Sequence, residues 1–255
     1  MIFKVRLKQQ VNIMSLIDKA AESGDLELLI SLREQGHEWT TQTSAYAAGA
    51  GHLECLCYLH ENGCPWDVHA GNHAAACGQL DCLQYLHENG CEWDKWATRW
   101  AALHGHLNCL RYLHVHGCEC DEYTCTWAAK YGHLECLKYL HENGCLWNDE
   151  MATEWAAKNG HLHCLQYLYE IGCAFELIDT LSSLSKHIDT LDFDQYSWLR
   201  GFLFPHTESA DMPEELKDKC KAKIAQIALE KQALEAELTD KLSLDVIKHC
   251  LHLFI

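Results

Sequence analysis

The sequence predicts an all-α solenoid of about six helix-turn-helix units, followed by a helical C-terminal segment. The first observation behind this prediction is a motif that reads Gly-His-Leu-Glu-Cys-Leu at Gly51 and Gly132 and recurs with small changes. The second is its period: the recurring glycines, from Gly24 to Gly160, are 27 residues apart four times and 28 apart once. The third is that each period holds two short helical patterns. Such units bury their apolar faces against their neighbours and offer a long surface to a partner.

Each predicted unit begins with a short first helix. Residues suited to cap its N-terminus stand at equivalent places: Asp67, Asp94, Asp121 and Asn148. The helix carries paired alanines, such as Ala101-Ala102, whose small side chains let the next helix approach closely. The recurring glycine, here Gly105, is expected to end the helix with a positive φ.

The second helix of each unit starts near that glycine. In the fourth unit it carries Leu107, Cys109, Leu110 and Leu113, and Tyr112 widens this apolar stripe. The stripe has the 3.6-residue helical period, and polar residues fill the gaps between its members. A second glycine ends the helix in every unit, at Gly36, Gly63, Gly90, Gly117, Gly144 and Gly172. The remaining residues suffice for short turns and leave no room for a long strand.

The composition favours a folded, acidic protein. The chain has 255 residues and is 48% apolar, which excludes a disordered tail as its main character. Its formal charge is −17, with no basic stripe, so nucleic acid is not an expected partner. The N-terminal residues do not resemble a signal peptide, and no stretch reaches the roughly 20 apolar residues of a membrane helix. We therefore expect a cytoplasmic protein without a membrane partner.

Ten of the sixteen cysteines stand in two registers of the repeat. One register holds Cys55, Cys82, Cys109, Cys136 and Cys164, and another holds Cys64, Cys91, Cys118, Cys145 and Cys173. Equivalent positions in stacked helices lie roughly 8–10 Å apart, whereas a disulfide needs Cα atoms within about 7 Å. The cysteines are therefore interpreted as small buried hydrophobes in a reducing cytosol.

The run Ala-Ala-x-x-Gly-His-Leu-Glu-x-Leu-x-x-Leu, followed by a helix-ending glycine, resembles the second half of an ankyrin repeat. The resemblance covers residues from about 17 to 175 and implies helix pairs that bind other proteins. Ankyrin repeats are about 33 residues long and carry Thr-Pro-Leu-His before the alanines, whereas these units are shorter and lack that tetrapeptide. The missing length falls where ankyrin repeats project a β-hairpin finger, so the fingers are expected to be shortened or absent. This form resembles repeat proteins abundant in large DNA viruses of protists and in some protists, and a viral chain would act in the host cytoplasm.

Two aromatic ladders follow the repeat. Trp39, Trp66, Trp93 and Trp147 precede the caps and are interpreted as core packing, with Cys120 and Phe175 in the remaining places of that register. The second ladder stands immediately before the paired alanines and consists of Tyr46, His73, Trp100, Trp127 and Trp155. In ankyrin repeats this place often faces the concave side, so the second ladder is the candidate partner-binding surface. Packing between adjacent units is the alternative role for these residues.

No motif indicates catalysis. The chain has no Gly-x-Ser-x-Gly elbow, phosphate loop or dinucleotide fingerprint, so we predict no enzyme, no catalytic residue and no cofactor. The histidines are interpreted as capping and packing residues. Cys118, Cys120 and Cys125, near His114 and His116, form the cluster most suited to zinc, but their spacing fits no familiar paired-cysteine motif. We therefore predict no metal site and keep a metal- or redox-sensing protein as an alternative.

The repeat period stops near the end of the sixth unit. The predicted domains are the solenoid (1–175), a helical cap (176–204) and a C-terminal helical segment (205–255), in which a long helix precedes a short apolar one. The last helix is faintly similar to the opening helix of an F-box, with Leu244, Val246 and Ile247 as the candidate contacts. Protein binding through the solenoid is thus the predicted function, and an adaptor that recruits a ubiquitin ligase is the alternative.

Overall fold

The computed structural model describes residues 15–173, together with Thr180, Ser183, His187, Asp218 and Ala222. Residues 15–173 form helices and turns without a strand, which confirms the predicted all-α solenoid. The helices are α1 (Leu16–Ser23), α2 (Leu26–Glu34), α3 (Thr41–Ala50), α4 (Leu53–Glu61), α5 (Val68–Ala76), α6 (Leu80–Glu88), α7 (Lys95–Leu103), α8 (Leu107–Val115), α9 (Glu122–Lys130), α10 (Leu134–Glu142), α11 (Asp149–Lys158) and α12 (Leu162–Glu170).

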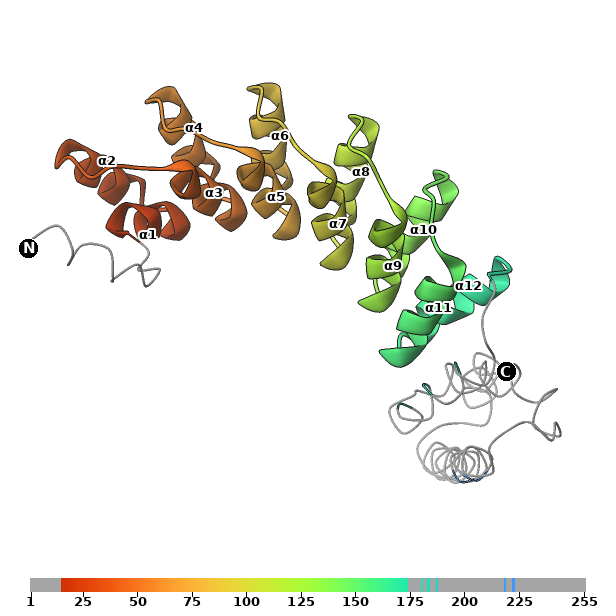
Figure 1. Ribbon diagram of the computed structural model, residues 1–255. Coiled ribbons are helices and arrows are strands. Elements are labelled where there is room, and N and C mark those ends of the chain that lie inside the picture. Colours follow the sequence, from red (N-terminus) through yellow and green to blue (C-terminus); the bar gives the residue numbers. More distant parts are fainter. Residues whose placement is uncertain are drawn as a thin grey trace, which may run out of the picture.

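The helices form a curved row of antiparallel pairs (Figure 1). The odd-numbered helices are the first helices of the units, and each packs against the next along the concave side of the row. The even-numbered helices form the outer row. Turns join each outer helix to the next inner helix, and these turns contain no strand in residues 15–173. The predicted loss of the β-hairpin fingers is therefore confirmed.

The inner helices have the predicted N-terminal caps and the predicted pairs of small side chains. The Asp67 and Asp94 carboxylates each accept a hydrogen bond of 3.0 Å from a backbone N–H in the first turn of the following helix. Asp121 and Asn148 cap α9 and α11 in the same way. The paired alanines are completely buried, which allows neighbouring inner helices to pack closely.

A histidine ladder joins successive units at the helix-ending glycines. The Nε2 atom of His52 donates to the carbonyl oxygen of Glu22 at 3.0 Å, and Nε2 of His133 donates to that of Leu103 at 2.9 Å. The imidazole of His133 lies directly against Gly105, whose φ is +77°. Glycine is thus required at position 105 for two reasons: the positive φ disfavours other residues, and the imidazole of the next unit leaves no space for a Cβ atom.

A second ladder joins the outer helices. Histidines near the ends of these helices are hydrogen-bonded through Nδ1 to a tyrosine hydroxyl of the next unit, in the pairs His60–Tyr85, His87–Tyr112, His114–Tyr139 and His141–Tyr167, at 2.7 to 3.0 Å. Trp66 and Trp93 stack on His60 and His87 with ring centroids 4.0 and 4.1 Å apart. Both indoles pack against the hydrophobic core, as predicted for their register.

The cysteines of residues 15–173 are free thiols, as predicted. Most are buried, and burial raises the pKa of Cys109 to about 11. The thiols of Cys64, Cys91 and Cys118 donate to backbone carbonyl oxygens of the preceding unit at 3.3 to 3.5 Å. These cysteines therefore fill space and satisfy backbone groups.

Among the described residues, no helix has the length and apolarity needed to cross a membrane. The predicted cap (176–204) and C-terminal segment (205–255) lie outside the described residues, apart from the few isolated positions named above. The candidate adaptor contacts Leu244, Val246 and Ile247 also lie outside them and remain predictions.

Candidate protein-binding surface

The predicted contact residues stand one on each inner helix from α3 to α11. Tyr46, Trp100, Trp127 and Trp155 are half-buried, and His73 is exposed. The structure brings some of them together, since the ring centroids of Trp100 and Trp127 are 6.1 Å apart. Tyr46 and His73 form an edge-to-face pair with centroids 6.4 Å apart. The residues thus pack between units and also keep part of their surface accessible, so their role in binding remains a prediction.

Two exposed aromatic residues that sequence reasoning missed extend this row. Trp96, one turn before Trp100 on α7, is 40% exposed, and Tyr123 at the start of α9 is 41% exposed. The centroid of the Trp96 ring lies 6.1 Å from that of Trp127. We call Trp96, Trp100, Tyr123 and Trp127 the aromatic patch. The spacing of Trp96 and Trp100, four residues apart on one predicted helix, was the signal that could have found it.

Arg99 lies at the base of the aromatic patch and is 8% exposed. Its Nε atom donates to Oδ1 of Asp121 at 3.0 Å, and its Nη2 atom donates to Oδ2 of the same carboxylate. Its guanidinium carbon lies 4.7 Å from the ring centroid of Trp96 and 4.9 Å from that of Tyr123. A paired guanidinium beneath aromatic faces holds the rings in place by cation–π attraction.

The charge of Arg99 stabilises the ionised carboxylate of Asp121. Burial acts to raise the pKa of Asp121, but the hydrogen bonds and the charge of Arg99 outweigh it and hold that pKa below its usual value. The carboxylate also caps α9 by accepting from the backbone N–H of Thr124 at 3.3 Å. Asp121 therefore fixes the start of α9 and the position of Arg99 at once.

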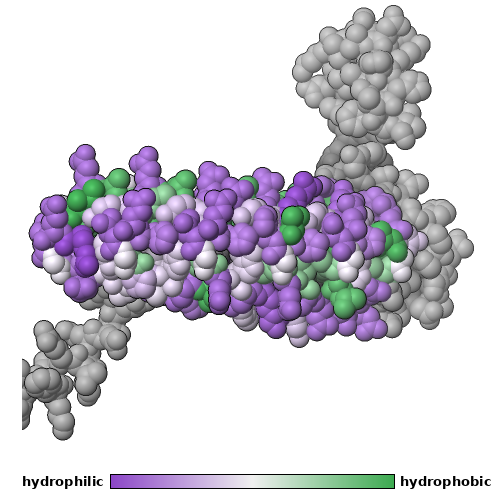
Figure 2. Space-filling view, turned by 90° about the horizontal axis from the view of Figure 1, so that it is seen from above, coloured by the Kyte–Doolittle hydropathy of each residue, from purple (hydrophilic) through white to green (hydrophobic). Residues whose placement is uncertain are grey.

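The aromatic patch lies away from the side of the row that the outer helices form. Figure 2 shows the side above the outer helices, which is mostly hydrophilic with scattered apolar side chains. The aromatic patch lies on the inner helices α7 and α9, on the other side of the row. Lys130 extends it toward α11, with its Nζ atom 4.0 Å from the ring centroid of Trp155. Tryptophan, tyrosine and arginine are the residue types that dominate the energetics of protein interfaces.

Comparisons with known proteins agree with this architecture. Family models of ankyrin repeats match residues 98–179 and residues 73–114. The crystal structure of the human ASB11 ankyrin repeat domain superposes with a TM-score of 0.55 at 23% sequence identity, covering 63% of this chain and 85% of that one. The fold is an ankyrin-repeat solenoid. No match was found among curated protein sequences. Ankyrin repeats generally mediate protein–protein interactions.

The cysteine cluster expected from the sequence is arranged differently in the ankyrin-repeat solenoid. Cys118 donates its thiol proton to the carbonyl oxygen of Asp94, and Cys125 is completely buried on α9. Cys120 instead lies with His114 and with Cys145 of the next unit. Cys120 and Cys145 belong to different registers of the repeat, so a comparison of equivalent positions in successive units does not reveal this group.

Proposed function

We propose that this chain is a non-enzymatic scaffold that binds a partner protein through the concave row of inner helices, with the aromatic patch at its centre. The observation that carries the proposal is the arrangement around Arg99. The partly exposed rings of Trp96 and Tyr123 lie there against a buried guanidinium that is itself paired with Asp121. Rings that are already fixed lose little conformational freedom on binding, which favours affinity.

The chemistry of the patch suits an apolar or proline-rich segment of the partner. Arg99 is neutralised by Asp121, so aromatic contact would outweigh charge in recognition. The net charge of −17 opposes binding to phosphate backbones. The free thiols of residues 15–173 suit a reducing compartment such as the cytosol.

The test is affinity capture with quantitative mass spectrometry from the source cell or its host. The Trp96→Ala/Trp100→Ala variant is compared with a control that removes two exposed apolar side chains outside the patch, Leu16→Ala/Val115→Ala, which are 59% and 75% exposed. We expect to capture partners that bind the wild type and the control equally well. Their affinity for the patch variant should be about thirtyfold lower, because losing an interface hot spot costs about 2 kcal/mol of binding free energy. Circular dichroism checks that both variants are folded. Equal binding by the patch variant would refute the proposal.

A chain that ends at Glu208 tests the adaptor alternative in the same experiment. Ubiquitin-ligase subunits that bind the full chain, and are lost from this truncation and from a Leu244→Ala/Ile247→Ala variant, would support an adaptor role. Partners that the truncated chain retains would support binding through the repeats alone.

A further inference from the structure

One unit departs from a packing arrangement that recurs elsewhere in the solenoid. A tryptophan stacks on the outer-helix histidine in three units, in the pairs His60–Trp66, His87–Trp93 and His141–Trp147, with ring centroids 4.0 to 5.0 Å apart. In the remaining one of these units the histidine is His114, and Cys120 stands in the place of the tryptophan. A small sulfur ligand thus replaces a large ring beside an imidazole.

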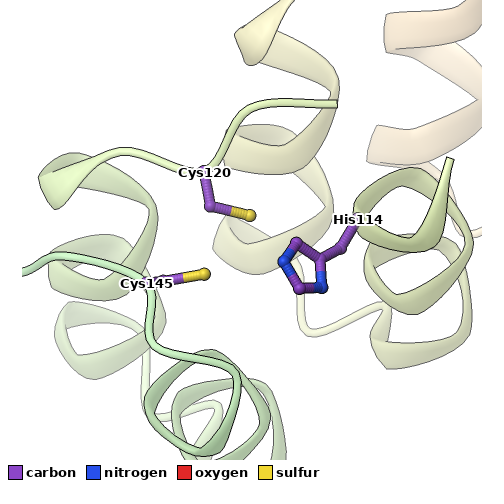
Figure 3. Close-up of side chains that lie close together, drawn as sticks. All are labelled: His114, Cys120 and Cys145. Carbon is purple, nitrogen blue, oxygen red and sulfur yellow. The ribbon is translucent and has the colours of Figure 1, made fainter. Parts of the chain in front are cut away.

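The substitution brings three metal-ligating side chains together. His114 comes from α8, Cys120 from the turn between α8 and α9, and Cys145 from the turn between α10 and α11. One ring nitrogen of His114 and the two Sγ atoms all lie within 4.8 Å of one another. Figure 3 shows the two sulfur atoms and the imidazole converging on one space between the turns.

The orientation of His114 is set by a neighbour. Its Nδ1 atom is hydrogen-bonded to the Tyr139 hydroxyl at 3.0 Å, and the ring edge that carries Nε2 faces the two sulfur atoms (Figure 3). When Nδ1–H donates to the Tyr139 oxygen, Nε2 keeps its lone pair for a ligand. Metal-binding histidines are commonly held by such a hydrogen bond on the ring nitrogen that does not ligate.

Cys145 differs from its counterparts in the other units. The thiols of Cys64, Cys91 and Cys118 donate to backbone carbonyl oxygens, whereas the Sγ atom of Cys145 lies within 4.8 Å of the Sγ atom of Cys120. Cys120 and Cys145 are also only half-buried, whereas the other three thiols are buried.

We propose that Nε2 of His114 and the two Sγ atoms of Cys120 and Cys145 bind one Zn²⁺ ion. Imidazole and thiolates are preferred ligands of zinc, and a tetrahedral site with Zn–S and Zn–N bonds of about 2.3 and 2.0 Å needs ligand atoms about 3.4–3.8 Å apart. Since the ligand atoms lie within 4.8 Å of one another, each pair needs to approach by at most about 1.4 Å. Both thiols lose their protons on binding, so the affinity rises with pH.

The fourth position of the zinc ion would be taken by water. The three ligands border a cavity of about 330 Å³ whose lining also includes Glu119, Asn143 and Leu146. Glu119, Asn143 and Leu146 are exposed, so the cavity is open to solvent. Three protein ligands and an exchangeable water are typical of zinc sites with an open coordination position.

The experiment uses the reduced full chain and titrates it with Zn²⁺ alone, followed by native mass spectrometry and calorimetry. Co²⁺ reports the geometry, because tetrahedral thiolate-bound Co²⁺ has intense visible absorption. The test variants are Cys120→Trp, which restores the tryptophan of the other units, and Cys145→Ser. Cys77→Ser, which removes an exposed cysteine outside the cluster, is the matched control.

We expect one Zn²⁺ per wild-type and control chain, and binding at least tenfold weaker in both test variants. Thermal unfolding monitors the fold, and Cys120→Ser replaces Cys120→Trp if the larger side chain unfolds the protein. Lack of stoichiometric zinc in the wild type would overturn the proposal. So would zinc that the folded test variants retain, or a wild-type chain that forms only a Cys120–Cys145 disulfide. The zinc site and the aromatic patch have no residue in common, so either proposal can fail alone.

Discussion

Because of the histidine ladder, we expect alanine to destabilise the fold more at Gly105 than at Gly117, although the two glycines have similar backbone conformations. Gly105 and Gly117 both have a positive φ, +77° and +83°. A Cβ atom on Gly105 would lie 2.4 Å from Nδ1 of His133, whereas a Cβ atom on Gly117 would have no atom within 4 Å. Alanine at either place must adopt the left-handed conformation, but alanine at Gly105 must also displace the His133 ring.

The difference can be estimated from these contacts. The left-handed conformation costs about 1–2 kcal/mol for a residue with a Cβ atom, and this cost applies to both variants. Displacing His133 also breaks its 2.9 Å hydrogen bond to the Leu103 carbonyl, which is worth about 1 kcal/mol net. We therefore expect Gly117→Ala to cost about 1–2 kcal/mol and Gly105→Ala about 2–3 kcal/mol.

Urea unfolding of the full chain, followed by tryptophan fluorescence, measures both free energies of unfolding. A double-mutant cycle isolates the contact with the ring. In a His133→Ala background the ring is gone, so the cost of Gly105→Ala should fall to that of Gly117→Ala. The reasoning is refuted if the two glycine variants cost the same in the wild type, or if removing His133 leaves the cost of Gly105→Ala unchanged.

Two further predictions concern titratable groups. Asp121→Ala removes the α9 cap and the partner of the buried Arg99, so urea unfolding should show a loss of about 3 kcal/mol. Asp121→Asn keeps a capping oxygen and should cost less; equal losses would contradict the dual role. Burial lowers the pKa of His106, His133 and His161 below 6.5, so the folded state favours their neutral forms. Stability is then fully present above pH 6.5 and falls as the pH drops through 6.5 toward the lowered values. His133→Gln, which introduces the residue found at the equivalent Gln79, should flatten the dependence of the unfolding free energy between pH 7 and pH 5, and an unchanged slope would oppose this assignment.

The sequence predicted the elements of this fold because their signals are local. The cap at Asp94, the positive φ at Gly105 and the buried alanine pairs each depend on residues within one or two turns of helix. The period then placed equivalent residues side by side, which is sufficient to predict a row of helix pairs and a ladder on the inner helices.

The centre of each candidate site was harder to predict because it joins different registers. Arg99 contacts Asp121 across two units, and Cys120 contacts Cys145 across two turns. The repeat period shows which residues occupy equivalent positions in successive units. It does not show the distance between residues that occupy different positions of the repeat. An alignment of the six units does show where the pattern breaks, and Cys120 in a tryptophan place is such a break.

The two candidate sites meet at adjacent residues. Cys120 belongs to the proposed zinc site, and Asp121 holds Arg99 beneath the aromatic patch. Zinc bound at Cys120 would restrain the turn that positions Asp121, so it should favour the arrangement of the patch seen here. Linkage then requires that zinc and the partner raise each other's affinity. Zinc added to the wild type should change the tryptophan emission and tighten partner binding, and neither effect should occur in Cys145→Ser. Stoichiometric zinc binding that leaves partner affinity unchanged would show that the two sites are independent despite their adjacency.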